Sequence, residues 1–186
     1  MMLKTRLGAG LVAVVIAVGL MTTTRPAIAA SAAEINRDVD KVLQGLYAKD
    51  PKAKDLTNRA KAVLVFPRIY KAGFMFGAQY GDGALRQGGK TVGYYNTVAA
   101  SYGLQAGAQV FGYILFFMTD SALDYLKKSG GFELGTGPTI AVLDTGAATA
   151  FTSTTLQSDM YAMFFNQKGL MGGLGVQGSK ISKINK

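Results

Sequence analysis

The chain has 186 residues, a formal net charge of +9, and neither histidine nor cysteine. The missing cysteines exclude disulfide bonds and thiol nucleophiles, and the missing histidines remove the usual general base of hydrolases. Ordinary zinc sites lose their preferred ligands for the same reason. The stability of the protein must therefore come from packing, and acid–base catalysis would depend mainly on carboxylates.

The first 29 residues are typical of a secretory signal peptide. Lys4 and Arg6 form a short positive region, residues 8–21 form an apolar stretch, and Ala27-Ile28-Ala29 is a suitable cleavage site. We therefore expect a mature start at Ala30 and an exported protein, periplasmic or associated with the cell envelope. The alternative is an uncleaved anchor, although a spanning helix needs about 20 apolar residues. Without a lipobox cysteine, we do not expect a lipoprotein.

The predicted mature chain is still basic. Lys4, Arg6 and Arg25 fall in the leader, which leaves 17 of the 20 basic residues against 11 acidic ones, a net charge of +6. A moderate positive charge serves solubility, and it also attracts anionic surfaces such as phospholipid headgroups or nucleic acid. Charge alone does not choose between these roles.

Residues 31–60 are predicted to form two helices. Ser31 and Glu34 have the spacing of a capping box, which predicts a helix start. Asp50-Pro51 predicts the end of this helix and the start of a second one that runs to about Arg59. Apolar residues recur at helical spacing in the first helix: Ile35, Val39, Val42, Leu43 and Leu46. We assign 30–61 as a helical segment of the same domain as 62–186.

From Ala62 onward the pattern favours β-structure. We expect short strands at 62–66, 74–80 and 84–87, with turns at Gly81-Asp82-Gly83 and Gly88-Gly89, then a helix over 121–128 that begins with Asp120 or Ser121 as its cap. Further strand-like segments are 140–143, 147–156, 160–165 and 170–178. Glycines inside strands mark bulges, bends or close backbone contacts. The fold class predicted is α+β: a strongly bent antiparallel β-sheet or partly closed barrel, with the N-terminal helices packed on it.

The segment 91–119 carries no charged residue. Its glycines, glutamines and aromatic residues favour a pair of core strands that bend near Gly103, over a membrane span or an apolar ligand surface. Both faces are largely apolar near the C-terminal end, so we expect burial there on both sides. Whether the aromatic face that includes Tyr113 and Phe117 is core or meets a ligand stays open.

The carboxylates do not form a convincing catalytic group. Asp120 and Asp124 lie one helical turn apart and suit a cap and a solvated position, whereas Asp82 and Asp144 lie in turn-like sequences. The glycine-rich segments lack the lysine and hydroxyl residue of a phosphate-binding loop. We therefore predict no enzyme activity, no cofactor and no metal.

Basic and aromatic residues alternate around the first strand, a mixture that suits a phospholipid interface. We predict six lipid-binding residues there: Arg59, Lys61, Arg68, Tyr70, Lys71 and Phe74. Single-stranded nucleic acid could bind the same mixture, and a solvated surface is the plain alternative. For the C-terminal lysines (Lys168, Lys180, Lys183 and Lys186) we expect a solvated, partly disordered tail.

Several short segments, in order along residues 55–184, resemble the SYLF domain family of lipid-binding proteins. They include 60–67 (AKAVLVFP), 71–77 (KAGFMFG), 103–107 (GLQAG) and 168–173 (KGLMGG). The resemblance implies a compact α+β domain with a bent sheet and binding to phospholipid membranes. Eukaryotic members recognise phosphoinositides and are linked to actin. This chain departs from those members in its export signal, in the lack of an SH3 domain, and in Gly93-Tyr94-Tyr95-Asn96, where many relatives have a Trp-Ser-x-Pro type sequence. We therefore expect it to meet ordinary anionic lipids and do not extend those two specificities to it.

The resulting hypothesis is an exported, non-enzymatic domain that associates peripherally with anionic phospholipid membranes through basic and aromatic residues. The alternative is a structural envelope protein that mediates protein–protein or self association, including homo-oligomers. The irregular strand spacing argues against a third hypothesis, a small outer-membrane barrel. We expect no nucleic-acid partner.

Overall fold

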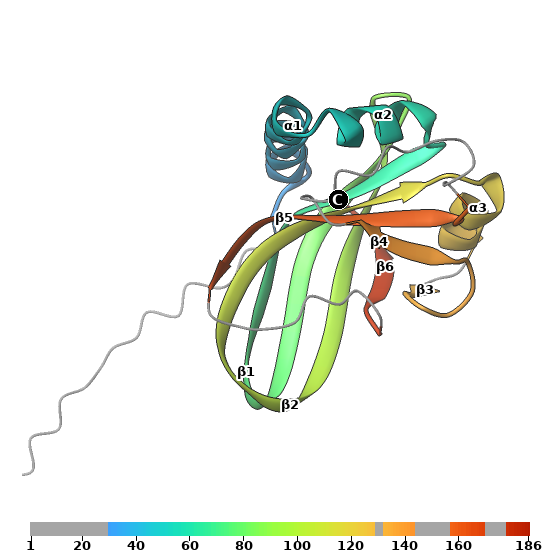
Figure 1. Cartoon of the computed structure of the whole chain (residues 1–186). Helices are drawn as coiled ribbons and strands as arrows, with labels where there is room; N and C mark the ends of the chain where they lie inside the picture. The colour runs from blue at the N-terminus through green and yellow to red at the C-terminus, as the bar shows by residue number, and fades with distance from the viewer. Residues whose placement is uncertain (1–29, 129–131, 144–156, 170–177) are drawn as a thin grey trace, which may run out of the picture.

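The computed structural model describes residues 30–128, 132–143, 157–169 and 178–186, with the side chains of 74–75 and 101–106 excepted. The predicted leader, the strand predicted at 147–156 and nearly all of that at 170–178 lie outside this part. The elements in chain order are α1 (Ala32–Lys49), α2 (Pro51–Arg59), β1 (Ala62–Gln87), β2 (Lys90–Phe117), α3 (Asp120–Lys128), β3 (Phe132–Glu133), β4 (Ile140–Leu143), β5 (Met160–Gly169) and β6 (Lys180–Ile184). Figure 1 shows α1 and α2 together on one side of the sheet, with α3 away from them.

The two N-terminal helices begin and end where the sequence predicts. The Ser31 hydroxyl accepts from the Glu34 N–H, and the Glu34 carboxylate accepts from the Ser31 N–H at 2.8 Å, which completes the capping box. Asp50 ends α1 and caps α2, where Pro51 takes the first helical position. The helix predicted at 121–128 is α3, but its cap is Thr119, whose hydroxyl accepts from the Ala122 N–H at 3.3 Å.

The sheet is built around β1 and β2, which pair antiparallel along most of their length. The turn predicted at Gly88-Gly89 joins them, and both glycines have positive φ, as a tight hairpin turn requires. The register breaks between Phe74/Phe76 on β1 and Ala106/Tyr102 on β2, a break that brackets Gly103. Both strands bend back there, at the lower end of the molecule in Figure 1. The predicted bend is confirmed.

The turn predicted at Gly81-Asp82-Gly83 is wrong, because these residues continue β1. The glycines serve another purpose. A Cβ on Gly81 would meet the Arg68 carbonyl oxygen, and one on Gly83 would meet the Val65 carbonyl oxygen, both closer than 3.0 Å. Missing side chains therefore let the second half of β1 lie against the backbone of its first half, which curls the sheet.

The remaining strands extend this curled sheet. Its order is β3-β6-β2-β5-β4, with β1 also paired to β2. Every pair is antiparallel except β4 and β5, which are parallel. The predicted α+β fold, a strongly bent and largely antiparallel sheet with N-terminal helices packed on it, is confirmed.

The expectation of a disordered C-terminal tail is wrong. Residues 180–184 form β6, which pairs with β2 through Thr97↔Ile181 and its neighbours. Beyond it, the Lys186 ammonium donates to the Ala30 carbonyl at 2.8 Å and lies 3.3 Å from Asp82, and both side chains of this ion pair are largely buried. A polar segment thus becomes ordered because β2 offers it an unpaired edge.

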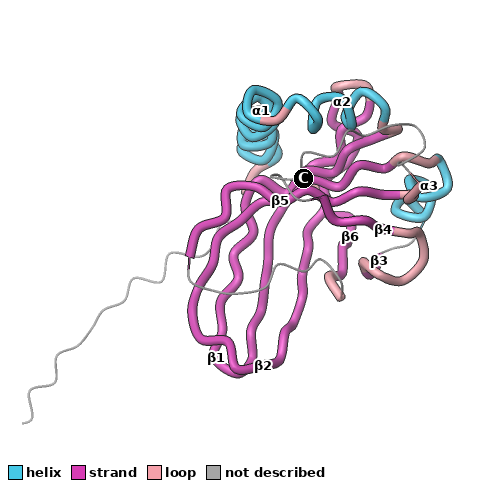
Figure 2. Tube along the Cα trace, viewed as in Figure 1, coloured by secondary structure: helices cyan, strands magenta, loops and turns pink. Residues whose placement is uncertain are grey.

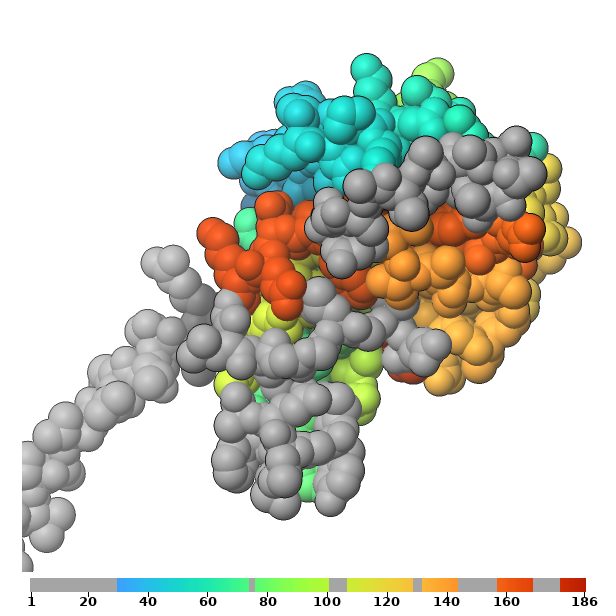
Figure 3. All heavy atoms as spheres, viewed as in Figure 1, coloured from blue at the N-terminus to red at the C-terminus, as the bar shows by residue number. Residues whose placement is uncertain are grey.

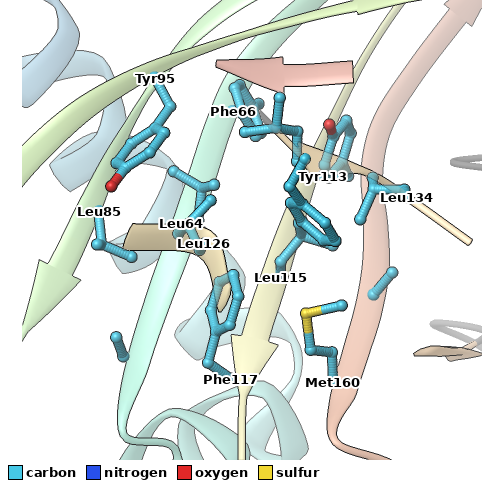
Figure 4. Packing of buried hydrophobic residues seen from close by; sticks show 14 of the residues in the cluster. Leu64, Phe66, Leu85, Tyr95, Tyr113, Leu115, Phe117, Leu126, Leu134 and Met160 are labelled. Carbon is cyan, nitrogen blue, oxygen red and sulfur yellow. The ribbon is translucent and has the colours of Figure 1, made fainter. Parts of the chain in front are cut away.

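Two hydrophobic clusters lie on opposite faces of the sheet. On the outer face, α1 and α2 cover Val63, Val65, Ile114 and Phe116. On the inner face, Leu64, Phe66, Tyr113, Leu115 and Phe117 pack with Leu126 of α3 (Figure 4). Tyr113 and Phe117 have no exposed surface, so this aromatic face, which the sequence left open between core and ligand surface, is core.

Asp159 joins the starts of β4 and β5 to the end of β2. Its carboxylate accepts from the Thr139 N–H (3.0 Å), the Thr139 hydroxyl (2.8 Å) and the Thr119 hydroxyl (3.2 Å). The two hydrogen bonds from Thr139, assisted by the one from Thr119, hold the pKa of Asp159 below its ordinary value. Protonation of this carboxylate should therefore weaken the junction.

We expect Asp159→Asn to destabilise the domain and to weaken its response to acid. A carboxyl whose folded pKa is lowered stabilises the fold above its unfolded pKa, about 3.9 for Asp, and that contribution is lost as the pH falls through the folded value. The substitution should cost about 1 kcal/mol at neutral pH, a low figure because the carboxylate is solvent-accessible. Thermal melts between neutral pH and pH values below the unfolded pKa measure both effects. Parallel profiles for the two proteins would show that Asp159 contributes nothing.

Candidate functional site

Beyond the helices, the outer face of the β1–β2 hairpin carries exposed apolar side chains. Figure 2 shows these two strands extending well past α1. We define the outer patch as Tyr70, Phe76, Tyr80 and Val98, which are 54%, 70%, 46% and 44% exposed. Tyr80 and Val98 are directly paired across the strands. Ile69 and Gln79, the residues just before Tyr70 and Tyr80, are buried on the inner face. Because side chains alternate along a strand, Tyr70 and Tyr80 lie on the outer face.

The phenol of Tyr80 is held in its neutral form. Partial burial, followed by its hydrogen bond to Asp82 at 2.6 Å and the charge of that carboxylate, raises the pKa of Tyr80 to about 12. At ordinary pH this ring can enter an apolar boundary without carrying charge. Tyr and Phe rings suit the boundary between headgroups and acyl chains, because such rings combine apolar bodies with, for Tyr, a polar tip.

A groove separates the C-terminal half of α1 from the sheet beside this patch. Its volume is about 700 Å³, within the range of about 300–1,000 Å³ that is usual for small-molecule sites. In Figure 3 the atoms of β5 lie directly below those of α1 on this side of the molecule. The apolar lining residues are Val42, Leu46, Pro67, Val110, Phe111 and Phe165. The charged ones are Lys41, Lys49, Arg68, Lys168, Asp38 and Asp50.

The groove lies where both neighbours of β2 carry a bulge. On β1, Pro67 and Arg68 together lie opposite Gly112, because Phe66 pairs with Tyr113 and Ile69 with Phe111. On β5, Asn166 and Gln167 lie opposite Phe111 in the same way. Pro67 suits a bulge because it has no N–H to offer a ladder. Among the described residues, Asn166 (φ 52°) is the one non-glycine residue with a positive φ.

A second hollow, of about 480 Å³, lies on the other side of α1. Its charges are already paired: the Arg86 guanidinium lies 2.6 Å from the Asp40 carboxylate, and the Lys61 ammonium lies 3.0 Å from Asp120. The two hollows therefore differ in the charge available to an incoming anion, which favours the first as a binding site.

The six residues predicted to bind lipid do not form one cluster. Arg59 ends α2 and pairs with Asp55 at 3.0 Å, and Lys61 precedes β1. Arg68 follows Lys61 by seven strand residues, or roughly 23 Å along an extended chain.

The other predicted residues divide between the two faces of β1. Arg68 donates to the Tyr70 hydroxyl at 3.3 Å, so these two residues lie together on the outer face. This hydrogen bond, followed by the charges of Tyr70 and Asp38, raises the pKa of the Arg68 guanidinium, which stays charged. Lys71 is opposite the buried Gln109 on the inner face, and the side chain of Phe74 is outside the described set.

Sequence reasoning did not assign the α1 lysines of the groove, or Phe76 and Tyr80 of the patch, to a site. The sequence did carry a signal for the patch, because Phe76, Ala78 and Tyr80 recur at every second position of the strand. Gln79, on the opposite face, is buried. The groove had no local signal, because its residues come from α1, β1, β2 and β5.

The described residues form neither a metal-binding cluster nor a membrane-spanning helix. In that part of the chain, no group of three or more Asp and Glu residues could hold a metal ion. None of the helices described is both long and apolar enough to cross a bilayer.

The curled sheet, the packed helices and the exposed aromatic face define a small α+β binding domain. Residues 98–186 match the family model Ysc84, described as Las17-binding protein actin regulator. Over residues 98–186 the chain thus matches the SYLF family, a family of binding domains, as the resemblance predicted. The matched region begins within β2 and includes β5 with Lys168, whereas α1, α2 and β1 precede it. A search of curated proteins found no match.

Proposed function

We propose that the protein is exported and binds anionic phospholipid surfaces peripherally, without catalysing a reaction. The observation that supports this most is the set of exposed apolar side chains in the outer patch, of which Tyr70 contacts Arg68 of a groove with basic side chains. Export is supported by the signal-like sequence of residues 1–29. The family supports a binding role.

The energetic argument combines the two features. Full removal of one large apolar side chain from water contributes about 1.5–3 kcal/mol, so partial insertion of Tyr70, Phe76 and Tyr80 supplies several kcal/mol. Each nearby Lys or Arg adds about 1 kcal/mol on an anionic surface, and salt screens this part. Patch and charges together therefore favour reversible adsorption to an anionic membrane.

Vesicle co-sedimentation tests the proposal. The protein without residues 1–29 should sediment with phosphatidylglycerol-containing vesicles, less with pure phosphatidylcholine vesicles, and less at high salt. Equal failure to bind both kinds of vesicle would disprove lipid binding. Fractionation of cells that express the full chain tests export, and retention of an uncleaved chain in the cytoplasm would contradict it.

The second candidate is protein association, in which the outer patch packs on an envelope protein or on a second copy. The exposed apolar surface fits it, and the matching family model is described as that of a protein-binding protein. Size-exclusion chromatography with light scattering separates the two candidates. A stable dimer that loses association when Phe76 is replaced by serine, and that does not sediment with vesicles, would favour this candidate.

A further inference from the structure

We propose that the groove between α1 and the bulged strands takes the phosphate of one anionic phospholipid headgroup, while the acyl chains of that lipid lie toward the outer patch. This inference rests on the proposed function and gives it a specific site. It differs from general adsorption, because one lipid would be held by defined side chains.

The first argument is the shape of the backbone. Bulges on β1 and β5 flank β2 at the same level, at Gly112 and Phe111, and both lie under α1. Bulges are common beside binding sites because they redirect side chains. The positive φ of Asn166 belongs to the same place, and backbone outliers of this kind cluster at ligand sites. Irregularities on two strands thus converge on one groove.

The second argument is charge. Four basic side chains line the groove against two carboxylates. Asp50 already accepts from the Lys52 N–H as the cap of α2, and Asp38, whose charge also acts on Arg68, lies 3.7 Å from Arg37. The lining therefore keeps a positive balance of four basic side chains against two carboxylates. An arginine and several lysines around one hollow suit a phosphate, because charge-assisted hydrogen bonds are stronger than neutral ones.

The third argument is continuity with the outer patch. Arg68 lines the groove, and its guanidinium donates to Tyr70, which belongs to the patch. A phosphate beside Arg68 would therefore leave the rest of the lipid next to the exposed ring of Tyr70. The apolar floor, with Val110 and Phe111, suits the glycerol and first methylene groups of such a ligand better than free phosphate alone.

The test compares two double variants with equal loss of charge. The groove variant is Arg68→Gln with Lys168→Gln, and the control is Lys54→Gln with Lys90→Gln, which do not line the groove. Circular dichroism and thermal melts confirm that both fold. We expect the groove variant to bind phosphatidylglycerol vesicles at least about tenfold more weakly than the control, the loss that a few charge-assisted contacts produce.

Two further probes identify the ligand chemistry. Phosphatidylcholine vesicles that carry oleate to the same surface charge should bind both variants equally, since their added anion is a carboxylate. Inorganic phosphate should compete only weakly, because it lacks the apolar part.

Equal affinity of the two variants for phosphatidylglycerol would overturn the groove as a site while leaving adsorption intact. Failure of the unmodified protein on every vesicle would overturn the proposed function itself. Strong competition by inorganic phosphate would make the site one for free phosphate and would overturn the lipid assignment.

Discussion

Replacement of Gly83 by alanine should keep the sheet from closing as tightly and should strongly destabilise the protein. The added Cβ would come closer than 3.0 Å to the Val65 carbonyl oxygen and to the Phe66 ring, which has no exposed surface. The carbonyl belongs to the backbone and cannot rotate away. Overpacking of a closed core costs about 1–3 kcal/mol and more where backbone must move, so we expect a loss of about 3 kcal/mol or greater.

The control for this prediction is Gly45→Ala in α1. Among the described residues, apart from its own stretch of α1, nothing lies within 4 Å of where a Cβ on Gly45 would stand, so the same chemical change meets open space. Alanine should stabilise the helix there by up to about 1 kcal/mol, because glycine is the poorer helix former. Urea unfolding measures both variants. A Gly83→Ala protein as stable as the unmodified one would show that the two halves of β1 are not in close backbone contact.

The triple variant Tyr70→Ser, Phe76→Ser, Tyr80→Ser should lose vesicle binding almost completely. The three rings supply the apolar part of the proposed interface, and their loss should weaken binding by about a hundredfold or more, given about 1.5–3 kcal/mol for each fully buried ring. The fold should survive, because these side chains lie outside both cores. Co-sedimentation with phosphatidylglycerol vesicles gives the measurement.

The matched control removes exposed apolar side chains from elsewhere. Val92→Ser with Val142→Ser changes residues that are 49% and 57% exposed and lie outside the patch. This protein should bind vesicles as the unmodified one does. Equal losses in the triple variant and the control would mean that general surface hydrophobicity, and not the outer patch, governs binding.

Local signals predicted much of the fold. The helix ends are one example: Ser31, Glu34 and Asp50-Pro51 cap backbone groups that lie only a few residues away in the chain. Their effect therefore does not depend on distant partners. Alternation in the uncharged segment separated Ile114 and Phe116 from Tyr113 and Phe117 correctly, because each strand face packs on its own cluster. Gly88-Gly89 likewise carries its turn conformation locally.

The errors have non-local causes. Gly81 and Gly83 have the composition of a turn, yet what requires glycine there is the backbone of Arg68 and Val65, more than ten residues earlier. Residues 180–184 carry the polar composition of a tail, and only the free edge of β2 orders them. The predicted site was too compact along the sequence, since Arg68 shares its groove with lysines of α1 and β5, whereas Arg59 and Lys61 pair with Asp55 and Asp120.

The most direct measurement of the central claim uses the absence of tryptophan from the chain. The substitution Phe76→Trp places one reporter at the most exposed ring of the outer patch, and Val142→Trp places it outside the patch. With phosphatidylglycerol vesicles, the tryptophan emission of the Phe76→Trp protein should shift to the blue and be quenched by brominated acyl chains, while that of the Val142→Trp protein should not change. Unchanged emission from Phe76→Trp protein that sediments with vesicles would contradict insertion of the outer patch into the membrane.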